Sequence, residues 1–345
     1  MTILGVDAMQ CVVFDAAGQL RTQARPMPQP AGPRQALIRV RATGICGTDR
    51  AILLGEFPAT PGVILGHETV GAVAEVGTDV RLVRPGDMVV VNPTFYCGDC
   101  PDCRRGRAQY CPHKDGREVG IDCPGAMADY VLAHERFLHR LPPDLPYRRA
   151  ALIEPLACVL ANLEQAAPRW DDQVLVAGAG PIGMLAAMVL ADRGHRPRLA
   201  ERDPFRARLA QQILPNVDVA HTANLDAGRP DIVIDTTGVL LGEAVEVVQP
   251  GGTVVVMGER ERATATLSAR SIATRGIRVV GAGPYPPRLF EVALGLAQNL
   301  PMELLVTHVL PLSRAADGFA LLGVGPDSGY QAGKVLLVPG TAEAP

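Results

Sequence analysis

The sequence has no excess of charge of either sign. Its 345 residues include 33 Lys and Arg and 36 Asp and Glu, a formal net charge of −3. A nucleic-acid-binding protein normally shows a basic excess or patch, so we expect no nucleic-acid partner. Lysine itself is nearly absent, with Lys114 and Lys334 its two occurrences, which we ascribe to genome base composition. A balanced, slightly acidic chain favours an enzyme that acts on a small molecule.

Long apolar runs are also missing, and with them any predicted transmembrane helix or membrane partner. The segment Met1–Val13 lacks the basic start and apolar stretch of an export signal, and the sequence contains no internal repeat. Eight cysteines in such a chain are expected to be reduced thiols or metal ligands rather than disulfides. The sequence therefore predicts a cytoplasmic protein.

The length of the chain predicts two domains. Residues 10–150 contain short β-like runs separated by glycine and proline, whereas residues 151–285 alternate strand-like and helix-like segments. Such alternation is typical of parallel βαβ units in a doubly wound sheet. The tail, with one helix-like stretch and the strand-like Lys334–Val338, is expected to rejoin the first domain. We thus predict an α/β protein with an all-β domain, 1–150 with 286–345, and a Rossmann domain, 151–285. The expected strands are 35–41, 70–76, 87–91, 173–177, 198–200, 231–235, 253–257 and 278–280, and the expected helices are 181–193 and 206–213.

A cluster of four cysteines is the clearest motif. Two residues separate Cys97 from Cys100 and Cys100 from Cys103, and seven separate Cys103 from Cys111. Four thiolates at this spacing can surround one tetrahedral zinc ion, and a shell without an open position indicates a structural role. Free thiols or an iron–sulfur cluster are the alternatives.

One cysteine and one histidine among glycines suggest half of a second, catalytic zinc site. Cys46 lies in Gly44-Ile45-Cys46-Gly47-Thr48-Asp49, and His67 lies in Gly66-His67-Glu68. Glu154 is a further candidate ligand because a charged residue inside an apolar stretch is costly to bury unless it is paired or bound to metal. Chance placement is the alternative for the Cys and His. For Glu154 the alternative is an acid at a helix N-terminus ahead of Pro155.

A glycine-rich turn follows the apolar run 173–177 and opens a predicted helix. Its residues are Gly178, Ala179, Gly180, Pro181, Ile182 and Gly183. Glycines at this spacing allow a tight turn and close approach of a pyrophosphate to the backbone. Glu201, at the end of the next strand, would accept hydrogen bonds from adenosine ribose hydroxyls and repel a 2′-phosphate, which favours NAD over NADP. NADP remains an alternative cofactor, because Arg202 or Arg206 at this position can bind the 2′-phosphate.

Together these motifs resemble the zinc-containing medium-chain dehydrogenase/reductase superfamily over nearly the whole chain. Gly66-His67-Glu68-x2-Gly71-x5-Gly77-x2-Val80 matches the zinc signature of that family, and Glu154-Pro155-Leu156 resembles its sorbitol and polyol dehydrogenase branch. The resemblance implies a GroES-like catalytic domain beside a Rossmann domain, with the active site between them. It also implies two zinc ions per chain and a homodimer or homotetramer joined near 277–281.

Residue roles follow from the same resemblance. Cys46, His67 and Glu154 would bind the catalytic zinc, and Glu68 would be an alternate ligand. Asp49 would fix the histidine tautomer, and Thr48 would take the proton of the substrate hydroxyl. The metal would lower the pKa of an alcohol so that hydride passes to the nicotinamide.

Two features of the sequence carry separate expectations. Many relatives read Cys-Gly-Ser/Thr-Asp-x-His, but Ala51 occupies the histidine position here. We expect the proton to leave Thr48 through a cofactor ribose hydroxyl and water, or through a group of the substrate. An Ala51→His variant with unchanged turnover and pH–rate profile would rule out a relay limitation. By the resemblance, Lys334 is expected to hold Glu68 off the metal.

The predicted reaction is hydride transfer between NAD(P) and a secondary alcohol of a polyol, sugar or cyclitol, with or without an amino substituent. Amino-alcohol oxidation of the threonine dehydrogenase type is the alternative within enzymes. A zinc-free quinone reductase-like protein and a non-catalytic zinc- and nucleotide-binding protein are alternatives of other classes.

Overall fold

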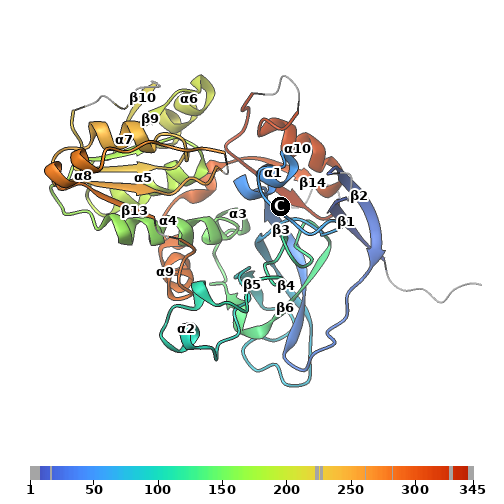
Figure 1. Ribbon diagram of the computed structural model, residues 1–345. Coiled ribbons are helices and arrows are strands. Elements are labelled where there is room, and N and C mark those ends of the chain that lie inside the picture. The colour runs from blue at the N-terminus through green and yellow to red at the C-terminus, as the bar shows by residue number, and fades with distance from the viewer. Residues whose placement is uncertain are drawn as a thin grey trace, which may run out of the picture. The chain divides into compact units, whose positions relative to one another are not determined.

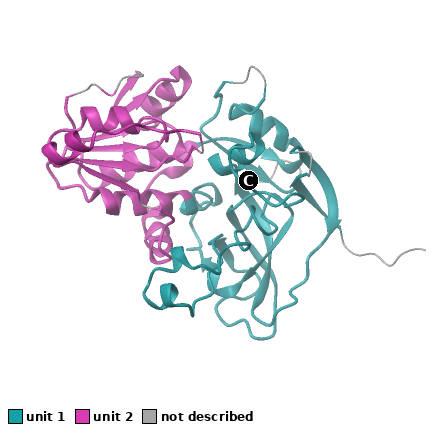
Figure 2. Ribbon diagram, in the orientation of Figure 1, with its two compact units in different colours: residues 1–154, 306–345 teal, residues 155–305 magenta. Residues whose placement is uncertain are grey.

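The computed structural model describes residues 8–340 apart from 16–17, 222–224, 226–227, 261, 282 and 326–328. It divides into two compact units, one of residues 1–154 with 306–345 and one of residues 155–305 (Figure 2). The tail from Val306 onward groups with the first unit. Residues 286–305, which the sequence assigned to the first domain, group with the second unit instead, because helix α9 (Arg288–Ala297) lies within it.

The second unit is built on a six-stranded, all-parallel sheet in the order β10-β9-β8-β11-β12-β13. The strands are β8 (Val174–Ala177), β9 (Arg198–Glu201), β10 (Asp218–His221), β11 (Ile232–Asp235), β12 (Thr253–Val256) and β13 (Arg278–Gly281). The central strands β8 and β11 are buried at every residue, as expected for strands covered on both faces. This confirms the predicted doubly wound sheet.

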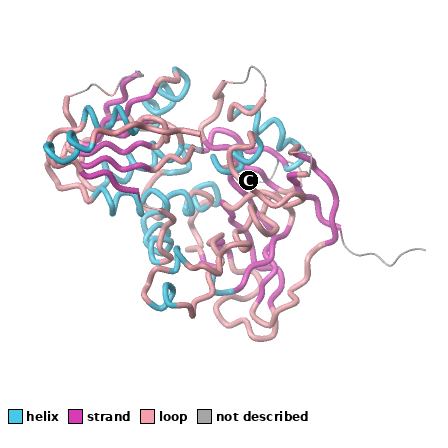
Figure 3. The backbone as a smooth tube through the Cα atoms, in the orientation of Figure 1, coloured by secondary structure: helices cyan, strands magenta, loops and turns pink. Residues whose placement is uncertain are grey.

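Helices lie above and below this sheet in the view of Figures 1 and 3. They are α4 (Ile153–Ala166, which begins in the first unit), α5 (Pro181–Asp192), α6 (Pro204–Ile213), α7 (Leu241–Val247), α8 (Ala269–Arg275) and α9. Ala244 and Val245 of α7 and Ile272 of α8 pack in a core cluster with the strand residues Leu175, Val233 and Val254. None of the described helices is long and apolar enough to cross a membrane.

The first unit contains a mixed sheet in the order β14-β15-β3-β4-β5-β7, with β6 also paired to β3. Its strands are β3 (Gln35–Gly44), β4 (Glu68–Val76), β5 (Met88–Val91), β6 (Tyr130–His134), β7 (Leu138–Arg140), β14 (Val306–Pro311) and β15 (Lys334–Val338), beside the hairpin β1 (Ala8–Phe14) and β2 (Leu20–Pro26). Because β15 pairs antiparallel with β3, the chain's last strand lies beside the strand that leads to Cys46.

Helices are few and short in this unit. They are α1 (Gly47–Leu53), α2 (Pro101–Arg104), α3 (Tyr147–Ala150) and α10 (Ala315–Leu321), with 3₁₀ turns η1 (Ala108–Tyr110), η2 (Glu135–Phe137) and η4 (Leu312–Arg314); a further turn, η3 (Met302–Leu305), ends the second unit. One core cluster joins Ile45 and Ile52 around α1 to Phe319 of α10 and Val335 of β15. The segment with Cys46 and Thr48 is therefore fixed by residues from the C-terminal end of the chain.

Candidate functional site

Cys46 lies at the turn between β3 and α1. Its backbone N–H donates to Asp49 Oδ2 at 2.8 Å, so the aspartate, inside the first turn of α1, satisfies the N–H of the residue that caps the helix. The backbone N–H of Ile45 donates to the Val335 carbonyl at 3.0 Å. Thr48, in the first turn of α1, has its Oγ1 3.7 Å from Cys46 Sγ. The predicted catalytic thiol and hydroxyl are therefore neighbours on one hydrogen-bonded turn.

His67 stands directly before β4 and is buried beside Asp49. Gly66 precedes it at φ +95°, and a side chain there would press on the backbone and side chain of Met127. His67 Nδ1 lies 3.8 Å from Asp49 Oδ1, and neither atom has a hydrogen-bond partner. Burial alone would lower the pKa of His67, but the charges of Cys46, Asp49 and Glu154 raise it well above its usual value. This pairing suits an aspartate that orients a metal-binding imidazole.

Glu154 lies in the first turn of α4. It is both an acid at a helix N-terminus and a charge that acts on the buried histidine, so the two interpretations of this residue are compatible. Its charge contributes to the raised pKa values of His67 and Lys334, against the effect of their burial. The structure thus brings Glu154 into the electrostatic environment of His67.

Glu68 and Lys334 form a buried ion pair. Lys334 Nζ donates to Glu68 Oε1 at 2.6 Å and to Oε2 at 2.7 Å, and it also donates to the Ile45 carbonyl at 3.2 Å. The predicted contact between these residues is confirmed. Gly44 permits it, because a Cβ at that position would collide with the Glu68 carboxylate. In this arrangement the lysine neutralises Glu68 directly behind the Cys46 turn.

The residues around Cys46 fit a zinc ion by chemistry. One thiolate, one imidazole and one carboxylate are a donor set that zinc accepts, and a catalytic site leaves a position for substrate. The orphaned Nδ1 and Oδ1 atoms of His67 and Asp49 match a carboxylate–histidine–metal arrangement. The ligand atoms of Cys46, His67 and Glu154 do not lie as close together as those of the four cysteines. Those four form the one group in the described part of the chain whose ligand atoms all lie within 4.8 Å of one another.

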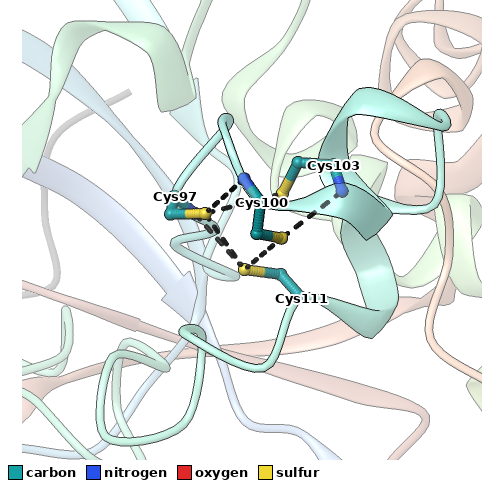
Figure 4. A group of neighbouring side chains, drawn as sticks. All are labelled: Cys97, Cys100, Cys103 and Cys111. Carbon is teal, nitrogen blue, oxygen red and sulfur yellow. Dashed lines mark hydrogen bonds between the residues drawn. The ribbon is translucent and has the colours of Figure 1, made fainter.

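The four-cysteine loop, residues 97–111, contains α2 and η1, and its sulfur atoms converge on one centre (Figure 4). Sulfur–sulfur distances are 3.9 Å for Cys97–Cys103, 3.8 Å for Cys100–Cys111 and 3.6 Å for Cys97–Cys111. Tetrahedral geometry with zinc–sulfur bonds of about 2.3 Å requires about 3.8 Å between sulfurs. The spacing therefore fits zinc without rearrangement.

Backbone amides favour thiolates at this centre. The N–H groups of Cys97, Cys100 and Cys103 each donate to a sulfur of the cluster at 3.4 to 3.5 Å. Burial opposes ionisation of Cys111, but the backbone N–H groups of Cys97 and His113 outweigh it and lower its pKa to about 6. Burial and the neighbouring thiols raise the pKa of Cys103 to about 12, so the amides favour one thiolate of the metal-free cluster over the others. Thiolates are the form that binds metal.

The glycine-rich turn connects β8 to α5 in the second unit. Gly178 has φ +99°, and Gly180 precedes Pro181 at the start of the helix. A Cβ at Gly183 would collide with the Gly178 carbonyl oxygen. The helix thus begins tightly against the strand, with Ile182 in its first turn, and its N-terminus offers the free backbone donors that bind a pyrophosphate.

Glu201 ends β9 next to this turn and is buried. Its Oε2 accepts from the Ala179 N–H and its Oε1 from the Asp203 N–H, both at 2.8 Å. Arg202 is exposed, whereas the Arg206 guanidinium lies 3.8 Å from the point where a Gly180 Cβ would stand. The acid and one arginine of the predicted cofactor set therefore adjoin the glycine turn itself.

Asp235 and Thr236, at the end of β11, are part of this site but were missed from the sequence. The buried Asp235 carboxylate accepts from the N–H groups of Thr237, Gly238 and Leu240 and from the Thr237 hydroxyl. Thr236 Oγ1 donates to the Ala177 carbonyl at 2.7 Å. Parallel strands place these turns side by side, and the apolar run Ile232–Ile234 that precedes Asp235 was the available signal.

Comparison with known proteins matches residues 32–143 to the alcohol dehydrogenase GroES-like domain. A sorbitol dehydrogenase of Halalkalibacterium halodurans is 30% identical over 93% of this chain and 96% of its own. An L-threonine 3-dehydrogenase of Xanthomonas campestris is 30% identical over 90% and 94%. A Sinorhizobium meliloti protein described as a zinc-binding dehydrogenase, solved bound to NADP, superposes with a TM-score of 0.85 at 30% identity, covering 96% of this chain and all of that one.

Proposed function

Because the chain belongs to the zinc-containing medium-chain dehydrogenase/reductase superfamily, we propose that it oxidises a secondary alcohol of a polyol, sugar or cyclitol, or reduces the matching ketone. It is a zinc-dependent, NAD(P)-linked alcohol oxidoreductase. The similarity to sorbitol dehydrogenase over nearly the full chain, together with a Glu154 charge that acts on His67, supports the polyol class.

The proposed catalytic group combines Cys46, His67 and Glu154 as metal ligands with Glu68 as an alternate ligand. Zinc at this position supplies Lewis-acid polarisation of the substrate oxygen. Asp49 orients the His67 ring through its Nδ1, 3.8 Å away. Lys334 keeps Glu68 in its own ion pair, and Glu68 becomes a ligand only when that pair opens.

The Thr48 hydroxyl is the proposed acceptor for the proton of the substrate. It is held in the first turn of α1, 3.7 Å from Cys46 Sγ, so a substrate oxygen near the metal position lies within its reach. The methyl side chain of Ala51 cannot carry this proton, so the proton leaves Thr48 through other groups.

The proposed cofactor turn is Gly178, Gly180, Pro181, Ile182 and Gly183, with Glu201, Arg202 and Arg206 around it. The fixed carboxylate of Glu201 favours NAD, since a 2′-phosphate would meet a buried negative charge. The four cysteines are the proposed structural zinc site. We also propose a cytoplasmic homodimer or homotetramer joined at the edge strand β13, where Val279 and Val280 are half-buried.

An activity panel tests this function. Purified protein is assayed with NAD and NADP against polyols, cyclitols, aminocyclitols and L-threonine. We expect reduction of NAD with a polyol or cyclitol and a lower kcat/KM with NADP. Activity confined to threonine would instead support the amino-alcohol reaction that the similarity to threonine dehydrogenase suggests. Zinc-loaded protein that is inactive on the whole panel in both directions would contradict the proposed substrate class.

A further inference from the structure

Arg136 contacts the four-cysteine loop from outside the loop. It lies in η2, between β6 and β7, about 40 positions along the chain from the first cysteine. Its Nη1 donates to the Cys97 carbonyl oxygen at 2.9 Å. A charged donor to a backbone carbonyl is stronger than a neutral one, so this contact restrains the peptide that links Cys97 to Gly98.

Gly98 provides the space for the guanidinium. It adopts φ +90°, and a Cβ at this position would collide with Arg136 Nη1. The left-handed conformation favours glycine in any case, but the direction in which its missing side chain would point is filled by the arginine. The Cys97–Gly98 turn and the Arg136 side chain are therefore fitted to each other.

The guanidinium is itself held in place by two aromatic rings. Its Cζ lies 5.4 Å from the Phe137 ring centroid and 5.9 Å from that of Tyr96. These two rings meet edge to face, with centroids 5.1 Å apart. The Arg136 backbone N–H donates to His134 Nδ1 at 3.2 Å. Cation–π contacts and a fixed backbone restrict the arginine to few conformations.

The positive charge of Arg136 is opposite to the charge of a metal-loaded four-cysteine cluster. Four thiolates around one divalent metal leave two net negative charges, and a guanidinium nearby offsets part of them. The backbone N–H groups of Cys100 and Cys103 already donate to sulfurs of the cluster. The Cys97 carbonyl points out of the loop, and its partner is the arginine.

We infer that Arg136 is a positioning residue for the four-cysteine metal site: it holds the Cys97–Gly98 turn in the conformation that places Cys97 Sγ among the other three sulfurs. The inference rests on the proposed metal occupancy of these cysteines. Residues that support metal ligands from outside typically change metal affinity about 10–100-fold when removed. Because Arg136 is exposed, we expect an effect at the lower end of that range.

The test measures metal release from the full-length protein loaded with cobalt. Cobalt bound by four thiolates absorbs through thiolate-to-metal charge transfer, and Cys46 adds only one thiolate, so most of this absorption reports the cysteine loop. Excess EDTA is added and the decay is followed well below the unfolding temperature. Arg136→Met is compared with Arg105→Met, which removes the same charge from an exposed position at the end of α2.

We expect Arg136→Met to release cobalt about tenfold faster than the wild type, and Arg105→Met to stay within about twofold, as exposed charges contribute little. Equal rates for the wild type and Arg136→Met, with the cobalt spectrum intact at the start, would overturn the inference. A wild-type protein whose spectrum lacks the four-thiolate absorption would instead reject the proposed metal site itself.

A double-mutant cycle with Gly98→Ala provides a readout that general destabilisation does not change. Backbone strain from the new Cβ is present in both backgrounds, whereas its collision with the guanidinium exists only when Arg136 is present. We therefore expect Gly98→Ala to accelerate release more in the wild type than in Arg136→Met. Strictly additive effects on the logarithm of the rate would contradict a direct fit between the two residues.

Discussion

Lys334 and Glu68 form an ion pair whose residues are 3% and 1% exposed. Removing one partner from a buried pair leaves an uncompensated charge, which costs about 3–5 kcal/mol. We therefore expect Lys334→Met to lower the free energy of unfolding by that amount in urea denaturation. The double variant Glu68→Gln/Lys334→Met is expected to recover part of the loss. A Lys334→Met protein as stable as the wild type would show that Glu68 finds another partner, or a proton, at little cost.

Single residues also show what local sequence patterns can and cannot select. Cys46, His67, Glu68 and Glu154 stand in local patterns of glycine, acid or apolar neighbours, so each could be selected without a structure. Arg136 could not, because its partner lies 39 positions away and no local pattern distinguishes it from the other arginines. The same holds for Asp235, whose four donors come from the turn after it and whose role depends on the neighbouring strand.

Among the elements, η2 anchors the loop between β4 and β5 through Glu135. Its buried carboxylate accepts from the Arg81 and Leu82 N–H groups at 2.6 and 2.7 Å and from Arg34 Nε at 2.7 Å. Burial alone would raise the pKa of Glu135, but these hydrogen bonds outweigh it and lower the pKa. The carboxylate thus stabilises the fold only while it is ionised.

This gives a pH-dependent prediction for Glu135→Gln. Hydrogen bonds to a charged group contribute about 1.5–3 kcal/mol, so we expect a loss of that size at pH 7. A depressed pKa means that the stabilisation is present above the unfolded-state pKa of about 4.3 and is lost as pH falls through the folded-state value. The difference between wild type and variant should therefore shrink in urea titrations at lower pH. A difference that is constant from pH 7 to pH 3 would reject the role of the charge.

The turn between β8 and α5 allows a matched pair of glycine substitutions. A methyl group at Gly183 would collide with the Gly178 carbonyl oxygen, so Gly183→Ala must push the helix away from the strand. We expect this variant to lose NAD binding in calorimetry. Gly295, inside α9, has open space around its Cβ position. Gly295→Ala should keep NAD binding and gain about 0.5–1 kcal/mol of stability. Equal NAD affinity in the two variants would contradict the cofactor role of the turn.

Element prediction was strongest where apolar runs are continuous. The parallel strands β8, β9, β11, β12 and β13 were predicted within one residue at each end. Of these, β8 and β11 are buried at every residue and stand out by their apolar composition. Strand β2, almost wholly exposed, and the short edge strand β10 have no such pattern and were missed. The tail was expected to hold one helix, and it contains both α9 and α10.

At the scale of the whole molecule, the sheet of the first unit combines strands from the N-terminal and C-terminal parts of the chain. Strand β15 pairs with β3, and Lys334 at its start reaches Glu68 across 266 positions. The sequence predicts the return of the tail from its strand-like segment Lys334–Val338, but the pattern of this segment does not predict that it pairs with β3. The boundary near residue 305 depends on where α9 packs, which composition does not reveal.

The central claim is that the chain holds two zinc ions with separate roles, one at Cys46, His67 and Glu154 and one at the four cysteines. The most direct test of this claim measures the zinc content per chain and NAD-linked alcohol oxidation in the wild type, Cys46→Ser and Cys111→Ser. We predict two zinc ions in the wild type. Cys46→Ser should retain one zinc ion, fold normally and be inactive, whereas Cys111→Ser should lose the other zinc ion and unfold more easily. A Cys46→Ser protein that keeps two zinc ions and full turnover would contradict the account.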